Sequence, residues 1–211
     1  MKREEKNALS KQRILDAALR EFSAKGYEAA SLNTVCMQND ISKGIIYHYF
    51  KDKDALYLLC VADCFEKLTA HLEDRVIGAA GGAEGRLKAY FDARLRFFAE
   101  NPVYLGVFLS AVLTPPAHLT AALANARAQF DAHNAAALTD LLQSAPLREG
   151  LSISTVVEDF RMYMDYFNAR LRAALLKADT PEQAFREHET CCHRQLNILL
   201  YGVMERQNEQ N

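Results

Sequence analysis

The sequence contains few of the residues that interrupt helices and few runs that favour strands. Only nine glycines and five prolines occur among its 211 residues, and runs of β-branched residues are scarce. Half of the residues are hydrophobic, which is enough to build a real core. This composition predicts an all-α protein of one or two domains.

Long apolar runs, a leader segment and a paired set of cysteines are also missing. No run approaches the ~20 apolar residues that a membrane span requires, so we expect no membrane partner. The first thirteen residues, MKREEKNALSKQR, are charged and contain no apolar segment, unlike a secretory signal. Five cysteines is an odd number, which is typical of a reducing compartment rather than of a disulfide framework. We therefore expect a cytoplasmic protein.

The motifs of common catalytic sites do not occur either. The chain has no phosphate-binding glycine loop, no nucleophile elbow and no HExxH motif, so we expect neither an enzyme nor a cofactor. The cysteines and histidines that lie close together in sequence are Cys60 and Cys64, and then His188, Cys191, Cys192 and His193. A metal site needs three or four converging ligands, which these spacings do not provide. We interpret the thiols as buried helix residues, with metal or thiol sensing as the alternative.

What the sequence does contain is a stretch with the pattern of two short helices and a tight turn. It covers residues 31–53 and reads SLNTVCMQNDISKGIIYHYFKDK. Ser31 can cap the first helix and Ser42 the second. Between the helices, Asn39 and Asp40 tolerate the left-handed backbone of a sharp turn. Two capped helices joined in this way form a helix-turn-helix.

The second of these helices has an unusual composition for a core element. Ile46 and Phe50, four residues apart, can face inward, and Ile41 can anchor the turn. Gly44 costs a helix about 1 kcal/mol relative to alanine, which suggests that another molecule approaches its backbone closely. The side chains left pointing outward are Lys43, Ile45, Tyr47 and His48. This surface suits a DNA groove, where a recognition helix reaches base edges; the alternative is a surface helix between two core helices.

The charge distribution favours the same end of the chain. The net charge is −2, but residues 1–53 hold ten Lys and Arg against seven Asp and Glu. Residues 54–211 hold fifteen against twenty. The basic residues that precede or begin the first helix are Lys2, Arg3, Lys6, Lys11 and Arg13. They can neutralise phosphates, which would make binding salt-dependent, or they can form an ordinary solvated terminus.

The run over residues 14–57 resembles the DNA-binding domain of the tetracycline-repressor (TetR) family of bacterial regulators. The matching segments are ILDAALREFSAKGYEAAS and ISKGIIYHYFKDKDALY. The chain departs from the family pattern at Ala30, where threonine is frequent, and at Cys36, where alanine is frequent. It also has Asn39-Asp40 where Ala-Gly is usual, and Asp40 adds a negative charge near the DNA.

The resemblance implies a ligand-responsive dimer, most simply a repressor that a small-molecule effector releases from its double-stranded DNA operator. It implies a DNA-binding domain in residues 1–53 and a ligand-binding and dimerisation domain in residues 54–211. The residues expected to hold phosphates or to position the recognition helix are Ser31, Lys43, Tyr47, Tyr49 and Lys53. Ser42 and Gly44 are also expected to bind DNA, and Gly44 allows the close approach. Ile45 and His48 are expected to face bases, and Ile45 could contact a thymine methyl. The alternative is a helical ligand-binding or protein-interaction dimer without specific DNA binding, which the departures at Ala30 and Asp40 support.

Apolar spacing predicts the remaining helices. A first helix is expected over about 11–25 with Gly26 as its C-cap, and a long helix over about 53–80 is expected to serve both domains. The apolar face of that long helix includes Leu56, Leu59, Cys60, Phe65, Leu68 and Leu72. Further helices are expected over about 84–100, 103–113, 118–143, 153–177 and 182–205, the last with Thr180 as cap and Pro181 in its first turn. In the family the last two helices pair with those of a second subunit, so we expect a homodimer.

The resemblance also implies a small-molecule cavity among the middle helices. The apolar and aromatic candidates to line it are Phe91, Leu95, Phe98, Tyr104, Phe108, Phe130, Met164 and Phe167. The polar candidates are His133, Asn134, Arg161 and Tyr166. Ligand pockets are mostly apolar with few polar groups, so an apolar or aromatic effector is favoured. The alternative is that these aromatic residues simply form the core.

Overall fold

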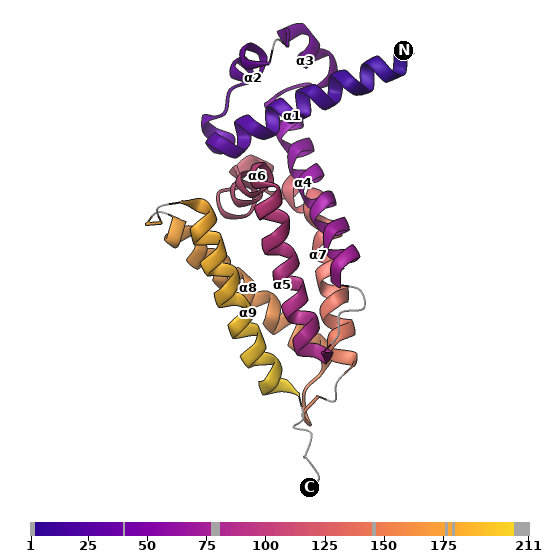
Figure 1. Cartoon of the computed structure of the whole chain (residues 1–211), viewed down its shortest axis with the longest axis vertical. Coiled ribbons are helices and arrows are strands. Elements are labelled where there is room, and N and C mark those ends of the chain that lie inside the picture. The colour runs from indigo at the N-terminus through magenta and orange to yellow at the C-terminus, as the bar shows by residue number, and fades with distance from the viewer. Residues whose placement is uncertain are drawn as a thin grey trace. The chain divides into compact units, whose positions relative to one another are not determined.

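The structure is a computed structural model that describes residues 3–39, 41–76, 81–144, 147–175, 177–178 and 180–204. Within these ranges the regular secondary structure is helical, and one isolated antiparallel bridge joins Leu147 and Met204. The helices labelled in Figure 1 are α1 (Arg3–Ala29), α2 (Leu32–Gln38), α3 (Lys43–Tyr49), α4 (Lys53–Val76), α5 (Gly82–Glu100), α6 (Pro102–Leu113), η1 (Ala117–Leu119), α7 (Thr120–Gln143), α8 (Ile153–Leu175) and α9 (Pro181–Val203). The prediction of an all-α fold is confirmed.

Packing divides the chain into two compact units. Unit 1 comprises Met1–Lys67 and Glu100–Ala128, and unit 2 comprises Leu68–Ala99 and Gln129–Asn211. Helix α4 contributes residues to both units. This division follows packing rather than function, so the functional boundary after residue 53 stays a prediction.

In unit 1, α1 packs against α2 and crosses α6. The predicted apolar stripe of α1 is buried and includes Ile14, Leu15, Ala18, Leu19 and Phe22. Gly26 breaks this helix with φ 67° and ψ −177°, a conformation that is essentially restricted to glycine. The predicted break is therefore confirmed, although α1 begins at Arg3 rather than near residue 11 and resumes for a short segment after Gly26.

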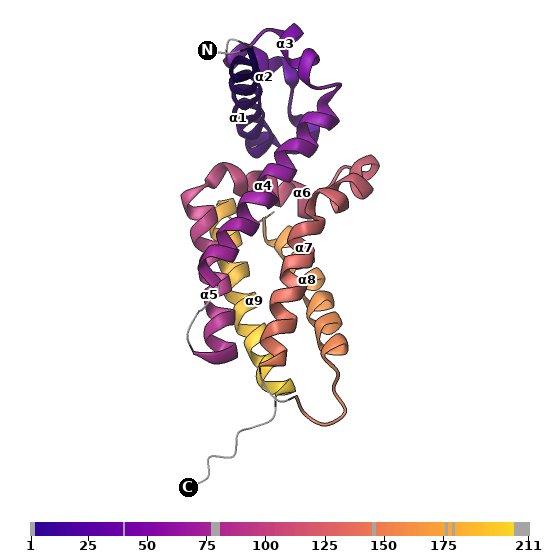
Figure 2. The same ribbon diagram turned by 90° about the vertical axis from the view of Figure 1, so that its right-hand side faces the viewer.

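In unit 2, α8 and α9 pack along each other (Figure 2). The core of this unit draws on α5, α7, α8 and α9 and includes Leu87, Phe91, Leu141, Leu142, Val156, Phe160, Phe167, Cys192, Leu196 and Leu200. Helix α9 starts as predicted, because Thr180 Oγ1 accepts a hydrogen bond from the Gln183 N–H at 3.2 Å and Pro181 occupies the first turn.

Three expectations about the other helices need correction. Leu59 was expected on the buried face of α4, but it is 39% exposed. Helix α6 begins at Pro102, one residue before the predicted start of about 103. The helix predicted over about 118–143 is α7, which ends at Gln143 as predicted but begins at Thr120, after a short 3-10 turn, η1.

No single helix among the described residues has both the length and the apolar character needed to cross a membrane. One pair, Pro102–Leu113 with Ala117–Gln143, meets these criteria jointly, with a bend of 89° between its two parts.

Candidate nucleic-acid interface

Helices α2 and α3 begin at the two predicted serine caps. Ser31 Oγ accepts from the Asn33 N–H at 3.2 Å, and Ser42 Oγ accepts from the Ile45 N–H at 3.4 Å. The Ser31 N–H in turn donates to Glu21 Oε1 at 3.0 Å, which fixes the start of α2 to α1. Both helices are therefore seven-residue elements whose beginnings are set by local hydrogen bonds.

The turn between them is held by side chains rather than by left-handed backbone at Asn39. Asn39 has φ −127°, so the expected left-handed conformation is wrong for this residue. Its Nδ2 donates to the Val35 carbonyl at 3.1 Å, and Arg20 of α1 donates to its Oδ1 at 2.8 Å. Ile41 is buried as predicted. Asp40, the expected negative charge near the DNA, lies outside the described residues.

The outer face of α3 is open, as the sequence predicts. Ile46 and Phe50 are buried, whereas Ile45 is 43% and Tyr47 is 58% exposed. The other exposed residues of this helix are Lys43, Gly44 and His48. Apart from Gly44 itself, its two chain neighbours and the backbone of its own helix, no described atom lies within 4 Å of the position that a Cβ on Gly44 would occupy, so the helix backbone is accessible there. Such a helix can enter a major groove with a cation, an aliphatic group and two aromatic side chains.

Other predicted DNA-binding residues form contacts within the protein. Ser31 and Ser42 use their hydroxyls as caps. The Lys53 ammonium donates to the Glu28 carbonyl at 3.2 Å and lies 4.4 Å from the centroid of the Tyr27 ring. The hydroxyl of Tyr49 donates to Asn7 Oδ1 on α1 at 3.0 Å.

A polar network that sequence reasoning missed joins the ends of α1 and α4 to η1. Tyr27 donates to Asp54 Oδ1, and His118 Nε2 lies 3.2 Å from Asp54 Oδ2. The hydrogen bond from Tyr27 is the main cause that lowers the pKa of Asp54. Burial, followed by this same hydrogen bond, raises the pKa of Tyr27. His118 lies far from both partners in sequence, so no local sequence pattern predicts this network.

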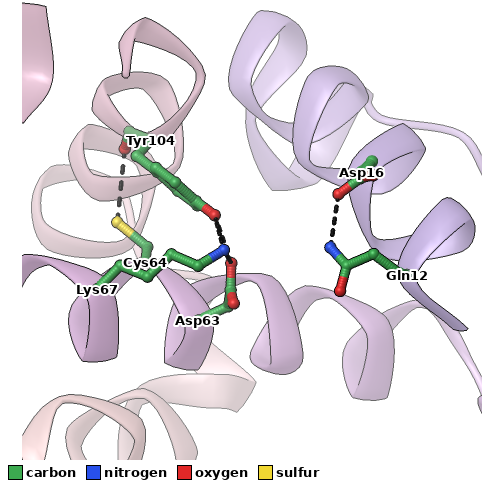
Figure 3. Close-up of polar contacts among 6 residues, drawn as sticks. All are labelled: Gln12, Asp16, Asp63, Cys64, Lys67 and Tyr104. Atoms are coloured by element: carbon green, nitrogen blue, oxygen red, sulfur yellow. Dashed lines mark hydrogen bonds and ion pairs between the residues drawn. The ribbon is translucent and has the colours of Figure 1, made fainter. Parts of the chain in front are cut away.

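A second network places Tyr104, a predicted ligand residue, in the packing of α4 against α6. Its hydroxyl donates to Asp63 Oδ2 at 2.6 Å, and Lys67 lies 3.0 Å from the same oxygen (Figure 3). Burial and the Asp63 carboxylate raise the pKa of Tyr104 to about 12. The Cys64 thiol donates to the Tyr104 carbonyl at 3.6 Å. Tyr104 thus serves the packing of unit 1.

The two cysteine thiols of α4 lie in surroundings that keep them protonated and therefore unreactive. Cys60 and Cys64 are fully buried, and burial raises the pKa of both well above its usual range. A thiol must be deprotonated to bind metal or act as a nucleophile. Across the ranges that the structure describes, no group of three or more His, Cys, Asp or Glu side chains is placed to hold a metal ion.

The structure brings some of the predicted ligand residues together in unit 2 and separates others. The buried ones are Phe91, Phe98, Phe130 and Phe167, and the partly buried ones are Leu95, His133, Asn134 and Met164. Tyr104 and Phe108 belong to unit 1. The Arg161 side chain is 66% exposed and pairs with Glu158 at 2.6 Å, so it lies on the solvent side of α8. Tyr166 is also exposed.

The core of unit 2 contains a buried ion pair that sequence reasoning missed. Arg94 Nε of α5 lies 3.3 Å from Glu189 Oε2 of α9, with side chains 5% and 0% exposed. Burial acts to lower the pKa of Arg94, but the Glu189 carboxylate, Tyr90 and Cys192 together outweigh it, and the pKa is raised. His188 Nδ1 lies 3.1 Å from the other Glu189 oxygen. Burying two charges in an apolar core is costly. The sequence feature that could have indicated this ion pair is the presence of one charged residue on the apolar face of each of the two helices.

Comparison with known proteins places these features in a family. The family described as bacterial regulatory proteins, tetR family, matches residues 14–60, which contain the capped helix-turn-helix. The transcriptional repressor KstR of Mycolicibacterium smegmatis is 28% identical over 71% of this chain and 71% of its own length. The transcriptional regulator UidR of Escherichia coli is 33% identical over 33% of this chain, which is 35% of its own length.

The fold has relatives among solved structures as well. The transcriptional regulator FadR from Bacillus subtilis, solved in complex with stearoyl-CoA, superposes with a TM-score of 0.65. The superposition covers 86% of this chain and 96% of that chain at 16% identity, a level at which the likeness concerns the fold. The local helix-turn-helix geometry, the matched segment and the whole-chain fold agree. Residues 14–60 of this chain form a DNA-binding domain of the tetR family of bacterial regulatory proteins, and the chain is a helix-turn-helix transcriptional regulator.

Proposed function

We propose that the protein is a dimeric repressor that binds its operator through α3 and leaves it when a small-molecule effector binds in unit 2. The open outer face of α3 carries this proposal. Lys43, Tyr47 and His48 are exposed there on a helix whose inner face is buried. Within that face, Lys43 and Tyr47 would contact phosphates, and Ile45 and His48 would face bases.

Dimer formation is supported by an exposed apolar surface on the last two helices. On α8 it includes Met162, Tyr163 and Tyr166, and on α9 it includes Ile198 and Tyr201. Helices α8 and α9 pack against each other, and several large exposed apolar groups on such a pair of helices favour an interaction surface. A two-fold dimer through these helices, predicted over about 153–177 and 182–205, would present two recognition helices to two half-sites.

The effector proposal is supported by the interior of unit 2. Its core combines aromatic residues such as Phe91 and Phe167 with the buried Arg94–Glu189 pair. An apolar or aromatic effector with one polar group would match such surroundings. FadR, whose fold is similar, was solved with stearoyl-CoA, a ligand that has a long apolar part. The predicted lining residues in this unit are Phe91, Leu95, Phe98, Phe130, His133, Met164 and Phe167. Arg161, also predicted to bind the effector, is exposed and could contact it only from the surface of α8.

The test is fluorescence anisotropy with DNA from upstream of the protein's own gene and with scrambled DNA, each at two salt concentrations. We expect preference for the upstream DNA and weaker binding at higher salt. The variants Lys43→Ala and Tyr47→Ala should weaken binding while the protein stays folded and dimeric in sedimentation experiments. Equal, weak binding to both DNAs would contradict the proposal and favour a ligand-binding or protein-interaction dimer.

A further inference from the structure

Helix α1 extends well beyond its predicted start and reaches the recognition helix. It begins at Arg3, so residues 3–10 add about two turns to the helix expected from residue 11. Two contacts join the N-terminal part of α1 to α3, one from the added turns and one from Lys11. The Tyr49 hydroxyl donates to Asn7 Oδ1 at 3.0 Å, and Lys11 Nζ lies 5.6 Å from the centroid of the Tyr49 ring. Asn7 and Lys11 are one turn apart, so both lie on the side of α1 that faces Tyr49.

The first contact changes what Tyr49 can do on DNA. A tyrosine hydroxyl has a single proton to donate. Phosphodiester oxygens only accept hydrogen bonds, so a hydroxyl that donates to Asn7 cannot also donate to a phosphate. The resemblance to the TetR family assigned Tyr49 a phosphate-holding or positioning role. In this chain the geometry favours positioning.

The second contact places a cation beside the recognition helix. Lys11 is exposed, and its ammonium lies over the face of the Tyr49 ring, an arrangement that is attractive for a cation. The ring restricts the side chain without burying its charge. A lysine held in this way can still reach a phosphate, because its three N–H donors are not consumed by the ring.

We propose that Lys11 binds a DNA phosphate, and that Tyr49 and Asn7 are positioning residues that hold it beside α3. This inference rests on the proposed function, because it assumes that α3 binds DNA. It extends the interface from the helix-turn-helix to the first turns of α1. Lys11 then supplies the charge contact that the Tyr49 hydroxyl does not make.

The experiment measures operator binding by anisotropy over a series of salt concentrations. Lys11→Gln should weaken binding on the order of fivefold near physiological salt and reduce the slope of log K against log salt by about 1. Asn7→Ala and Tyr49→Phe should weaken binding in the same direction and also lower the slope. The matched control is Lys88→Gln, an exposed lysine on α5 that pairs with Asp92 at i+4 and should leave both quantities unchanged.

A double-mutant cycle separates positioning from direct contact. If Tyr49 acts through Lys11, the double variant Lys11→Gln/Tyr49→Phe should bind about as well as Lys11→Gln alone. Additive losses, together with an Asn7→Ala variant that binds like the wild type, would overturn the inference and assign the Tyr49 hydroxyl to a phosphate. An unchanged salt slope in Lys11→Gln would overturn it as well.

These outcomes are distinct from failure of the proposed function. A wild-type protein that binds operator and scrambled DNA equally would contradict the proposed function and, with it, this inference. A wild-type protein that prefers its operator, with a Lys11→Gln variant of equal affinity and slope, would overturn the inference alone. Circular dichroism of each variant checks that the helices remain folded.

Discussion

The substitution Gly106→Ala tests the close packing of α6 against α1 in unit 1. Gly106 lies on α6 where this helix crosses α1. A Cβ at this position would lie 2.3 Å from Ser23 Oγ, 2.4 Å from the Ser23 carbonyl oxygen and 2.8 Å from its Cα. Two of these three atoms belong to the backbone and cannot rotate away. Alanine therefore forces the two helices apart.

The size of the effect follows from these distances. Ordinary contact between carbon and other heavy atoms requires about 3.5 Å, so the helices must separate locally by roughly 1 Å. Overpacking of this kind typically costs about 1–3 kcal/mol. The higher helix propensity of alanine offsets up to about 1 kcal/mol. Because backbone atoms are involved, we expect a net loss of about 1–2 kcal/mol in the free energy of unfolding.

The assay is urea unfolding followed by circular dichroism at fixed protein concentration. The matched control is Gly44→Ala, also a helical glycine of unit 1, which has open space around its Cβ position. The double variant Ser23→Ala/Gly106→Ala removes the hydroxyl but leaves both backbone atoms of residue 23 in the way of the new methyl group, so it should remain nearly as unstable as Gly106→Ala. Full recovery in the double variant, or wild-type stability in Gly106→Ala, would refute the reasoning.

Three further predictions concern single residues. Gly44→Ala should raise the free energy of unfolding by up to about 1 kcal/mol and weaken operator binding in anisotropy, because the methyl group keeps DNA from the backbone; equal affinity would contradict close approach. Glu189→Ala leaves the Arg94 charge buried, and urea unfolding should show a loss of about 3–5 kcal/mol. The stabilisation that Asp54 gains from Tyr27 should be complete above pH of about 4 and decline as the pH falls through the lowered pKa of the folded protein. Asp54→Asn should remove that part of the pH dependence in unfolding experiments between pH 3 and 7.

The features that the sequence predicted well depend on neighbouring residues. Ser31 and Ser42 cap helices through hydrogen bonds to N–H groups two or three residues away, so their pattern is visible in a short window. The glycine at position 26 marks a break because its own φ requires it. The inward and outward faces of α3 follow from helical periodicity alone.

The features that were missed or misplaced depend on residues that are distant in sequence. Tyr104 looked like a lining residue, but its hydroxyl is taken by Asp63, 41 positions earlier. The partner of Arg94 is Glu189, on another helix, and periodicity does not say which buried charge meets which. The same holds for Tyr49, whose partner Asn7 lies 42 positions away. A hydrogen-bond donor can be recognised from sequence, but its acceptor is known only once the helices are packed.

Helix α6 contacts both α1 and α4, the two helices that flank the helix-turn-helix in the sequence. Its backbone approaches that of α1 at Gly106, where the Ser23 carbonyl oxygen and Cα would lie 2.4 and 2.8 Å from an added Cβ. Its Ser110 hydroxyl lies 2.9 Å from the Tyr57 hydroxyl of α4, and the Tyr57 ring packs edge-on against Phe22 and Tyr27 of α1, each with centroids 5.0 Å apart. Close-packed contacts of this kind transmit shifts rather than damp them. We therefore expect a shift of α6 to displace α1 and the start of α4, because both helices contact it directly.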